Sequence, residues 1–337
     1  MLQLILGFTF NVPDMTRPLR GSLRIITVAA AALLSAHAVR AASGITGAGS
    51  SAAAPVYKVW ADEYAKTHSD ELRYDPIGSG AGMARINRRD VDFGASDIIA
   101  SGADLKKNGL VMFPTVITGV VPVVNPGLKL PSRPIHLIVR ADGSGTTYHF
   151  SDYLSHVHAG WKQRYGVANH FSWPVGAIAV KGNAAIAKAV QQTPDSIGYI
   201  DYNYMVDDGL SAVSMKNAEG AFVQANTETF HQAVVHRTWY STGDFSTELN
   251  DLAGAKSWPI TMGTYIAVPR VATNSERTER ALLFITWACL NGDALARQAK
   301  FVPLPEKVQA SAYAEISKVS GQSGESIGAR LMSNLLK

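Results

Sequence analysis

The chain has 337 residues, of which 47% are hydrophobic and 17% are charged, and its formal net charge is +4 at pH 7. This composition is typical of a soluble globular protein with one large domain or two smaller ones, and it excludes a disordered chain or a fibrous repeat. The first 41 residues hold four arginines and one aspartate, so their removal lowers the net charge to +1. Composition therefore gives no support to nucleic-acid binding.

Residues 1–41 have the three parts of a secretory signal peptide. A basic segment after Met15 leads into an apolar run, and small residues follow at the spacing that signal peptidase accepts. The apolar run is shorter than the roughly 20 residues that a membrane span needs. We expect cleavage near Ala38 or Ala41 and a free periplasmic protein. Met15 is a candidate for the true start, since the residues before it fit no part of a signal peptide.

The rest of the chain alternates between helix-like and strand-like segments, which indicates an α/β fold with largely parallel sheets. Two long β-rich runs, 115–125 and 259–268, are candidates for strands that carry the chain between two lobes. The single cysteine, Cys289, lies in an apolar helical segment, so it cannot form an internal disulfide and is expected in the core. Helices are expected at about 52–66, 83–89, 182–194 and 275–300, and strands at about 196–204 and 258–270.

Four turns share a composition rich in glycine and hydroxyl side chains. They read TGAGSSA at 46–52, IGSGAG at 77–82, FGASD at 93–97 and RADGSGTT at 140–147. Glycine lets backbone amides approach a ligand, and a helix N-terminus presents unpaired N–H groups with partial positive charge. Such turns before helices are ready-made anion sites, although each one alone is better explained as a helix cap.

The last turn adds a pair of opposite charges two residues apart. Arg140 offers a planar two-pronged donor to an oxyanion, and Asp142 is placed to hold that guanidinium. A surface ion pair is the alternative explanation of the two residues. The turn lies between an apolar strand and a helix whose apolar residues recur at helical spacing.

Taken together, these motifs resemble the periplasmic phosphate-binding proteins of bacterial high-affinity phosphate ABC importers. The resemblance runs in family order from about Ile45 to Val308, and its further motifs are FPTVITGVVPVVN, SIGYIDYNY and WPIT. It implies a two-lobed α/β fold, each lobe a mostly parallel sheet flanked by helices, with crossover strands between them. Lobe 1 would be residues 42–118 plus 262–337, and lobe 2 would be residues 119–261.

The resemblance also implies a receptor that binds inorganic phosphate between its lobes and passes it to the permease and ATPase subunits of an importer. It implies no catalytic residue, no metal, no cofactor and a monomer. Asp142 would hold the Arg140 guanidinium in the orientation that binds the ligand. By position, the phosphate ligands would be Ser51, Ala52, Ser79, Asp97, Arg140, Ser144, Gly145 and Thr146.

The role implied for Asp97 has a physical reason. Phosphate near neutral pH carries a proton, and a carboxylate accepts the hydrogen bond of that proton. Sulfate carries no proton, so the same carboxylate would repel it and leave charge unpaired. One residue can therefore separate two anions of the same shape.

The sequence departs from the family pattern in two places. Ala52 stands where relatives usually have phenylalanine, which removes apolar cover but keeps the backbone amide. After Asn125 the chain runs directly into PGLKLPSRP, as though a strand and helix had been excised. The 11 residues from Asn125 to Ile135 reach at most about 36 Å, too few for both elements. We expect lobe 2 to lack an edge element.

Three alternatives remain open at this point. A different tetrahedral oxyanion, such as sulfate or molybdate, is the nearest, and Asp97 argues against it. A secreted phosphatase would use Ser144 and Asp142 with a histidine, but the GxSxG elbow is missing. A metal site would need histidines that converge, but His149 and His156 are seven residues apart and His158 points elsewhere on a helix. The histidine of the phosphatase alternative would be one of His149, His156, His158 and His170.

Overall fold

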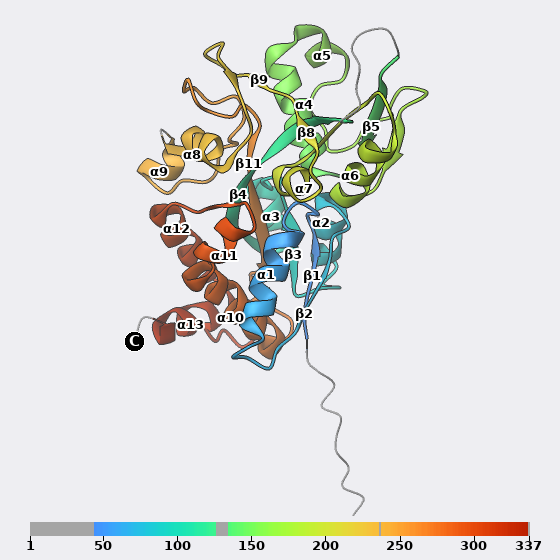
Figure 1. The fold of residues 1–337 in the computed structure, drawn as a ribbon. Coiled ribbons are helices and arrows are strands. Elements are labelled where there is room, and N and C mark those ends of the chain that lie inside the picture. Colours follow the sequence, from blue (N-terminus) through green and yellow to red (C-terminus); the bar gives the residue numbers. More distant parts are fainter. Residues whose placement is uncertain (1–43, 126–133, 236, 336–337) are drawn as a thin grey trace, which may run out of the picture. The chain divides into compact units, whose positions relative to one another are not determined.

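A computed structural model describes residues 44–125, 134–235 and 237–335 (Figure 1). Residues 42–337 form one compact unit. The predicted signal peptide, and residues 126–133 of the shortened connection, lie outside the described residues. Within the described part of the chain, no helix is long and apolar enough to cross a membrane.

The sheet begins with three parallel strands at the N-terminal end of the described chain. β1 (Ile45–Gly49) lies between β2 (Leu72–Asp75) and β3 (Phe93–Ser96), and β11 (Thr261–Pro269) pairs antiparallel with β3. The motif at 77–82 follows β2, but two motifs that the sequence predicted as turns are largely strand: 46–49 belongs to β1, and FGAS at 93–96 is β3 itself. The carboxyl ends of the three strands lie at the same edge of the sheet, so the residues that follow them are brought together.

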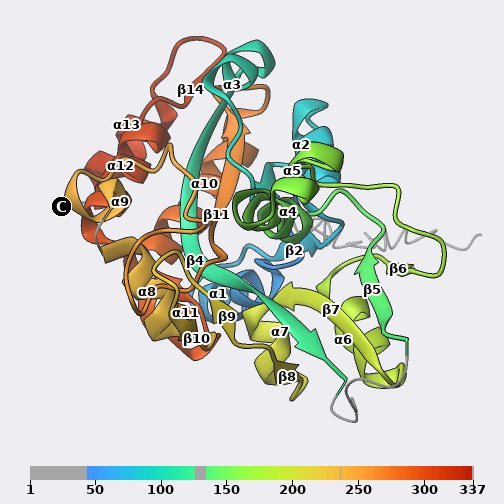
Figure 2. The ribbon, with the colours of Figure 1, turned by 90° about the horizontal axis from the view of Figure 1, so that it is seen from above.

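Strand β4 (Leu110–Val124) joins this part of the sheet to a second part. Its first residues, up to Gly119, pair with β11, whereas Val120–Val124 pair with β7 (Ser196–Asp201). β5 (His136–Arg140) is parallel to both β7 and β6 (Ile178–Val180). Figure 2 shows β4 beside β11 and continuing toward β7, β5 and β6. The predicted α/β class is confirmed, and β4 and β11 make the sheet mixed.

Helices flank both parts of the sheet. The first expected helix, 52–66, is α1 at 54–64, and the last, 275–300, is divided into α10 and α11 at Gly292. The helices are α1 (Ala54–Tyr64), α2 (Ser79–Asn87), α3 (Gly102–Asn108), α4 (Gly145–Val157), α5 (Ala159–Arg164), α6 (Asn183–Gln192), α7 (Tyr202–Asp207), α8 (Thr227–Val235), α9 (Thr238–Ser241), α10 (Ser275–Asn291), α11 (Asp293–Gln298), α12 (Glu306–Ile316) and α13 (Ile327–Leu335). Short strands are β8 (Ser211–Ala212), β9 (Met215–Lys216), β10 (Phe222–Val223), β12 (Val271–Ala272), β13 (Val302–Pro303) and β14 (Ser320–Gly321).

Two of the sequence-based element boundaries were wrong. The expected strand 196–204 ends at Asp201, because the Asp201 side chain accepts a hydrogen bond from the Asn203 amide and caps α7. The expected helix at 83–89 begins earlier, at Ser79, so that residue lies at a helix N-terminus.

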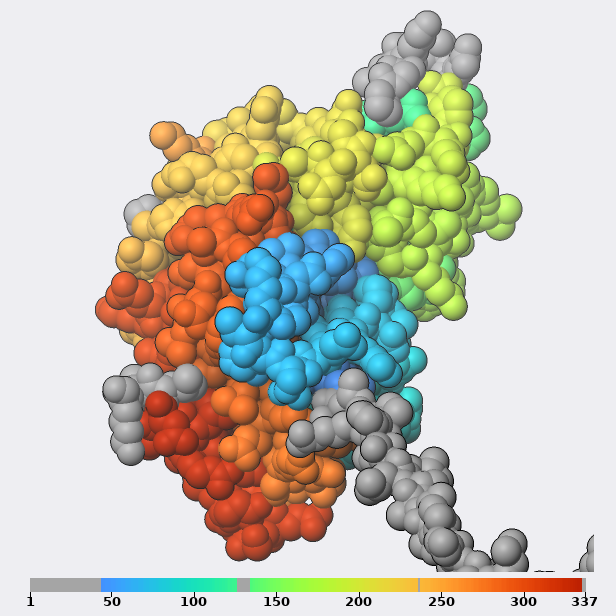
Figure 3. All heavy atoms as spheres, turned by 60° about the horizontal axis from the view of Figure 1, so that its bottom comes forward, coloured from blue at the N-terminus to red at the C-terminus, as the bar shows by residue number. Residues whose placement is uncertain are grey.

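Two clusters of buried side chains pack against the sheet. One of them lies among β1, α1 and the C-terminal helices α10 to α13, and it includes Tyr57, Phe113 and Phe284. Cys289 on α10 is buried, as predicted. Figure 3 shows α1 (blue) beside these helices (orange and red). Trp239 and Trp258 belong to the other cluster, which follows β4. The apolar cores hold the strand ends, and therefore the turns, in place.

Candidate functional site

The four turns meet in one buried cluster. Three of them lie at the carboxyl ends of β1, β2 and β3, and the fourth lies between β5 and α4. The Gly80 amide donates to the Gly143 carbonyl at 3.0 Å, which ties the second turn to the fourth. The structure thus brings together all eight residues that the sequence predicted as ligands.

Arg140 is the buried cation of this cluster, with 2% of its surface exposed. Its Nε donates to Asp142 Oδ1 at 2.7 Å, and its Nη2 donates to Asp142 Oδ2. Nη1 donates to Thr146 Oγ1 at 2.9 Å, and Nη2 also reaches Ser51 Oγ at 3.3 Å. The predicted pairing of Arg140 with Asp142 is present, and the pair is buried rather than at the surface.

Asp142 is held ionised by this arrangement. Burial acts to raise the pKa of its carboxyl, but hydrogen bonds and the charge of Arg140 outweigh burial and hold that pKa below its usual range. The Gly182 amide adds a hydrogen bond at 3.1 Å to Oδ1. Both carboxylate oxygens of Asp142 therefore have partners, and each of them accepts from the Arg140 guanidinium.

The Ser144–Thr146 turn begins helix α4. Ser144 Oγ accepts from the Thr147 amide at 3.2 Å, which caps the helix, and lies 2.7 Å from Thr146 Oγ1. A Cβ added at Gly145 would lie far inside van der Waals contact of the Asp97 side chain. Glycine at this position is therefore what allows α4 to approach Asp97.

Asp97 is the buried anion of the cluster, with 2% of its surface exposed. Ser79 Oγ donates to its Oδ2 at 3.2 Å, and the Asp97 amide donates to Ser79 Oγ at 3.1 Å. Oδ1 is buried and has no hydrogen-bond partner among the described residues. Burial raises the pKa of the Asp97 carboxyl, although the Ser50 hydroxyl and the charge of Arg140 act in the opposite direction.

Residues of the first motif make more hydrogen bonds than the sequence predicted. Ser51 Oγ accepts from the Asn183 amide at 3.2 Å and from Asn183 Nδ2 at 3.0 Å, and the Ser51 carbonyl accepts from Tyr204 at 2.9 Å. The Ala52 amide donates to Ser50 Oγ at 3.1 Å. Sequence reasoning missed Ser50, Asn183 and Tyr204. Only the GNAA segment, in which Gly182 comes directly before α6, signalled any of them.

The histidines do not build the alternative sites. The described partners of Ser144 Oγ are Thr146 and the Thr147 amide, and no hydrogen bond to His149 is among them. His158 Nδ1 accepts from the Trp161 amide at the start of α5, and His156 Nδ1 lies 2.9 Å from the Asp152 carbonyl. Over residues 44–125, 134–235 and 237–335, no group of three His, Cys, Asp or Glu side chains is placed to hold a metal.

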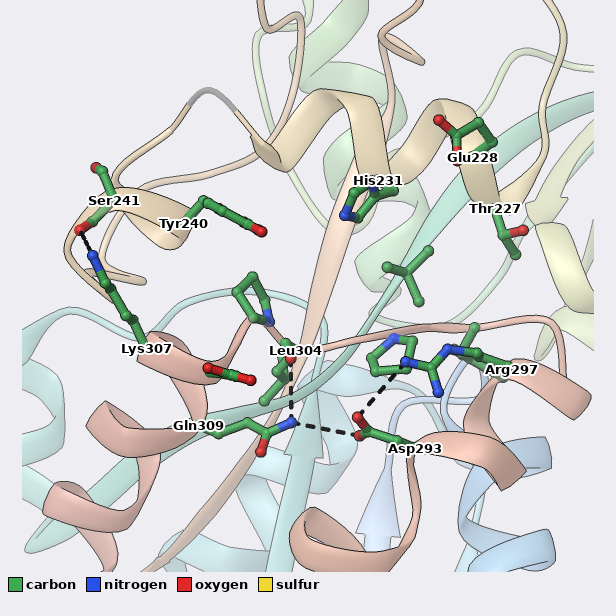
Figure 4. Close-up of a pocket in the computed structure, with 15 residues that line it drawn as sticks. Thr227, Glu228, His231, Tyr240, Ser241, Asp293, Arg297, Leu304, Lys307 and Gln309 are labelled. Atoms are coloured by element: carbon green, nitrogen blue, oxygen red, sulfur yellow. Dashed lines mark hydrogen bonds and ion pairs between the residues drawn. The ribbon is translucent and has the colours of Figure 1, made fainter.

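A cavity of about 950 Å³ lies elsewhere, between α8 and α9 on one side and α11 and α12 on the other (Figure 4). Lys307 Nζ donates to the Ser241 carbonyl at its margin at 2.7 Å, and Asp293 lies 3.8 Å from Arg297. None of the predicted ligand residues lines this cavity. A smaller cavity of about 310 Å³ reaches Ser79 and Gly80.

A sheet in two parts, joined by β4 and carrying facing polar turns, is the architecture of a two-lobed solute-binding protein. A model of the PBP superfamily domain matches residues 34–288. A structure of a high-affinity periplasmic phosphate-binding protein bound with phosphate superposes with a TM-score of 0.64 at 19% identity, covering 80% of this chain and 93% of that one.

Comparison with curated relatives identifies one family within this class of solute-binding proteins. The phosphate-binding protein PstS of Haemophilus influenzae is 36% identical, over 79% of this chain and 90% of the relative. The PstS protein of Xylella fastidiosa is 34% identical, over 80% of this chain and 84% of the relative. The chain belongs to the PstS family of phosphate-binding proteins.

The alignment with the Xylella fastidiosa protein runs over 307 positions and covers 80% of this 337-residue chain, so tens of aligned positions have no residue in this chain.

Proposed function

We propose that this chain is an extracytoplasmic receptor that binds inorganic phosphate between two lobes and delivers it to an ABC importer. The observation that carries the proposal is a buried cation and a buried carboxylate in one cluster of hydroxyls and helix N-termini. Arg140 supplies attraction for any oxyanion, and Asp97 supplies an acceptor that only a protonated oxyanion satisfies.

In this proposal each motif contributes groups that bind the anion. The guanidinium of Arg140 binds two oxygens, and the N-terminal turn of α4 supplies the amide of Gly145 together with hydroxyls. From the facing turns come further hydroxyls and the amide of Ala52, once that amide leaves Ser50 Oγ. The hydroxyls belong to Ser51, Ser79, Ser144 and Thr146.

Asp97 is the residue to which we assign selectivity. Its Oδ1 is buried without a partner among the described residues, an arrangement that costs free energy unless a donor reaches it. The proton of hydrogen phosphate is such a donor, whereas sulfate has none. The unpaired oxygen supports phosphate over sulfate and molybdate.

We place the lobe boundaries at residues 42–118 plus 262–337 and 119–261. Support comes from β4, which exchanges β11 for β7 as partner near Gly119. The crossover strands would then carry a hinge, and closure would bury the anion between the lobes.

The remaining parts of the proposal concern location and partners. A signal peptide cleaved near Ala38 or Ala41 would deliver a monomer to the periplasm, where permease and ATPase subunits would receive the ion. We expect no enzymatic activity and no cofactor. The named relatives, all phosphate-binding proteins, support these expectations.

Lobe 2 of this chain is proposed to work without the strand and helix that relatives have. Leu137 on β5 and Ile178 on β6 are 42% and 37% exposed, which fits a sheet that has lost its cover. The residues proposed to bind phosphate all lie outside that gap. Binding is therefore expected to survive the loss.

Equilibrium binding of phosphate with sulfate as competitor tests the proposal. The wild type should bind phosphate and not sulfate, and Asp97→Asn should bind phosphate more weakly and sulfate more tightly. Asp62→Asn, the same change at an exposed ion pair on α1, is the matched control and should leave both affinities unchanged. Tight sulfate binding by the wild type would refute phosphate selectivity. Hydrolysis of a chromogenic phosphate ester would favour the phosphatase instead.

A further inference from the structure

His149 is a completely buried histidine directly beside the proposed selectivity residue. It lies on α4, in the first turns after Gly145, and its exposed fraction is 0%. Its Nε2 is 2.6 Å from the carbonyl oxygen of Asp97, at the end of β3. The contact therefore joins the helix that carries the Ser-Gly-Thr turn to the backbone of the facing turn.

The surroundings of His149 select one tautomer. Asn250 Nδ2 lies 2.8 Å from Asp152 Oδ2, and since a carboxylate only accepts, this atom of the amide is the nitrogen. The same Nδ2 is 3.0 Å from His149 Nδ1, which is thus the acceptor. The proton of a neutral imidazole is then on Nε2, which donates to the Asp97 carbonyl. Glu248 is the other facing charge, with Oε2 3.9 Å from Nδ1.

Asp97 is consequently anchored from two directions. On its own side of the cluster, Ser79 Oγ contacts both its amide and its Oδ2. From the opposite side, His149 holds its carbonyl while Gly145 lies against its side chain. A carboxylate that must meet a single proton of the ligand needs this degree of positioning.

We propose that His149 is a positioning residue that latches α4 to Asp97 when the lobes are closed. This inference rests on the proposed function, in which α4 and Asp97 belong to different lobes. A bond that forms only on closure acts after the anion has been encountered. Its loss accelerates release of phosphate and leaves capture nearly unchanged.

The test is stopped-flow kinetics of phosphate binding on the wild type, His149→Leu and His149→Gln. Leucine fills similar space without a donor, and glutamine retains an amide N–H for the Asp97 carbonyl. We expect His149→Leu to raise the dissociation rate about 10-fold with an association rate within about twofold of wild type. His149→Gln should restore most of the difference. His156→Gln, on the exposed side of α4, is the matched control.

Equal dissociation rates for wild type and His149→Leu would overturn the latch, and so would a loss confined to the association rate. Imidazole ¹⁵N NMR of the wild type is independent of any variant that fails to fold: Nε2–H supports the latch and Nδ1–H overturns it. If the wild type binds no phosphate, the proposed function fails, and the latch is then decided by this spectrum alone.

Discussion

The two halves of the cluster carry different charged groups: an arginine paired with Asp142 in one half, and a single carboxylate in the other. The half built on β5 and α4 carries Arg140 and offers donors to any oxyanion. The half built on β1, β2 and β3 carries hydroxyls and one carboxylate, Asp97. A cation alone would not discriminate between anions of the same shape, and a carboxylate alone would repel them all. Under the proposed function, affinity and selectivity would lie in opposite halves of one site.

Two aspartates of the cluster have pKa values that their surroundings shift in opposite directions. Asp142 touches Arg140, and its pKa lies below the usual range despite burial. Asp97 has no guanidinium in hydrogen-bond contact among the described residues, and burial raises its pKa. An aspartate carboxyl is therefore held ionised in one half, whereas in the other half burial makes it take up a proton more readily.

Removing the cation should have the largest effect. Arg140→Ala leaves Asp142 buried without its partner, a change that costs about 3–5 kcal/mol, and phosphate affinity should fall at least ~100-fold. Arg140→Lys keeps the charge but loses the two-pronged geometry, so an intermediate loss is expected. Calorimetric titration measures both. Arg88→Ala, at an exposed ion pair, is the control. A folded Arg140→Ala protein with near wild-type affinity would refute the assignment of affinity to this half.

Forcing the halves apart should have the next largest effect. Gly145→Ala places a Cβ against the Asp97 side chain, so the cluster cannot close without a shift. We expect phosphate affinity to fall about 10-fold or more, because the added Cβ keeps the two halves from closing fully. The free energy of unfolding should change little when the two halves are apart, because the Cβ then has room. Gly102→Ala is the control, because a Cβ there meets no atom within 4 Å. An unaffected titration for Gly145→Ala would contradict the close approach.

The ionised aspartate should stabilise the fold in a pH-dependent way. Its native pKa is depressed, so its stabilisation is complete above the unfolded pKa of about 3.9 and is lost as pH falls through the native pKa. Asp142→Asn should cost about 2 kcal/mol of unfolding free energy at pH 7. Urea unfolding across pH measures the deficit, which should shrink below pH ~4. A deficit independent of pH would show that the charge is unimportant.

The facing aspartate should behave in the opposite way, with a smaller effect. The native pKa of Asp97 is raised, so stability falls as pH rises from about 3.9 toward the native pKa. Asp97→Asn should therefore be neutral or gain less than about 1 kcal/mol at pH 7, although it weakens phosphate binding. The same urea series measures this. A large loss of stability for Asp97→Asn would erase the contrast between the halves.

Local chemistry made much of this site predictable. The strand before Arg140 and the helix after Gly145 follow from propensities within a few residues, and their positions agree with the structure. The motif FGASD, predicted as a turn, is strand β3 except for Asp97. The end of β7 was missed, because capping of α7 by Asp201 competes with strand propensity in SIGYIDYNY. Ser50, Asn183 and Tyr204 were missed because their contacts join segments far apart in the chain.

The order of residues along the chain was enough to predict the α/β class, the glycine- and hydroxyl-rich motifs, the export signal and the opposed charges Arg140 and Asp97. The union of the two parts of the sheet by β4, the approach of Gly145 to Asp97 and the contact of His149 with the Asp97 carbonyl emerge only in the folded chain. The difference comes from how far apart along the chain the interacting residues lie. Turn and cap chemistry acts between neighbours in sequence, whereas the contact between His149 and Asp97 joins residues 52 positions apart and forms only when α4 packs against the end of β3.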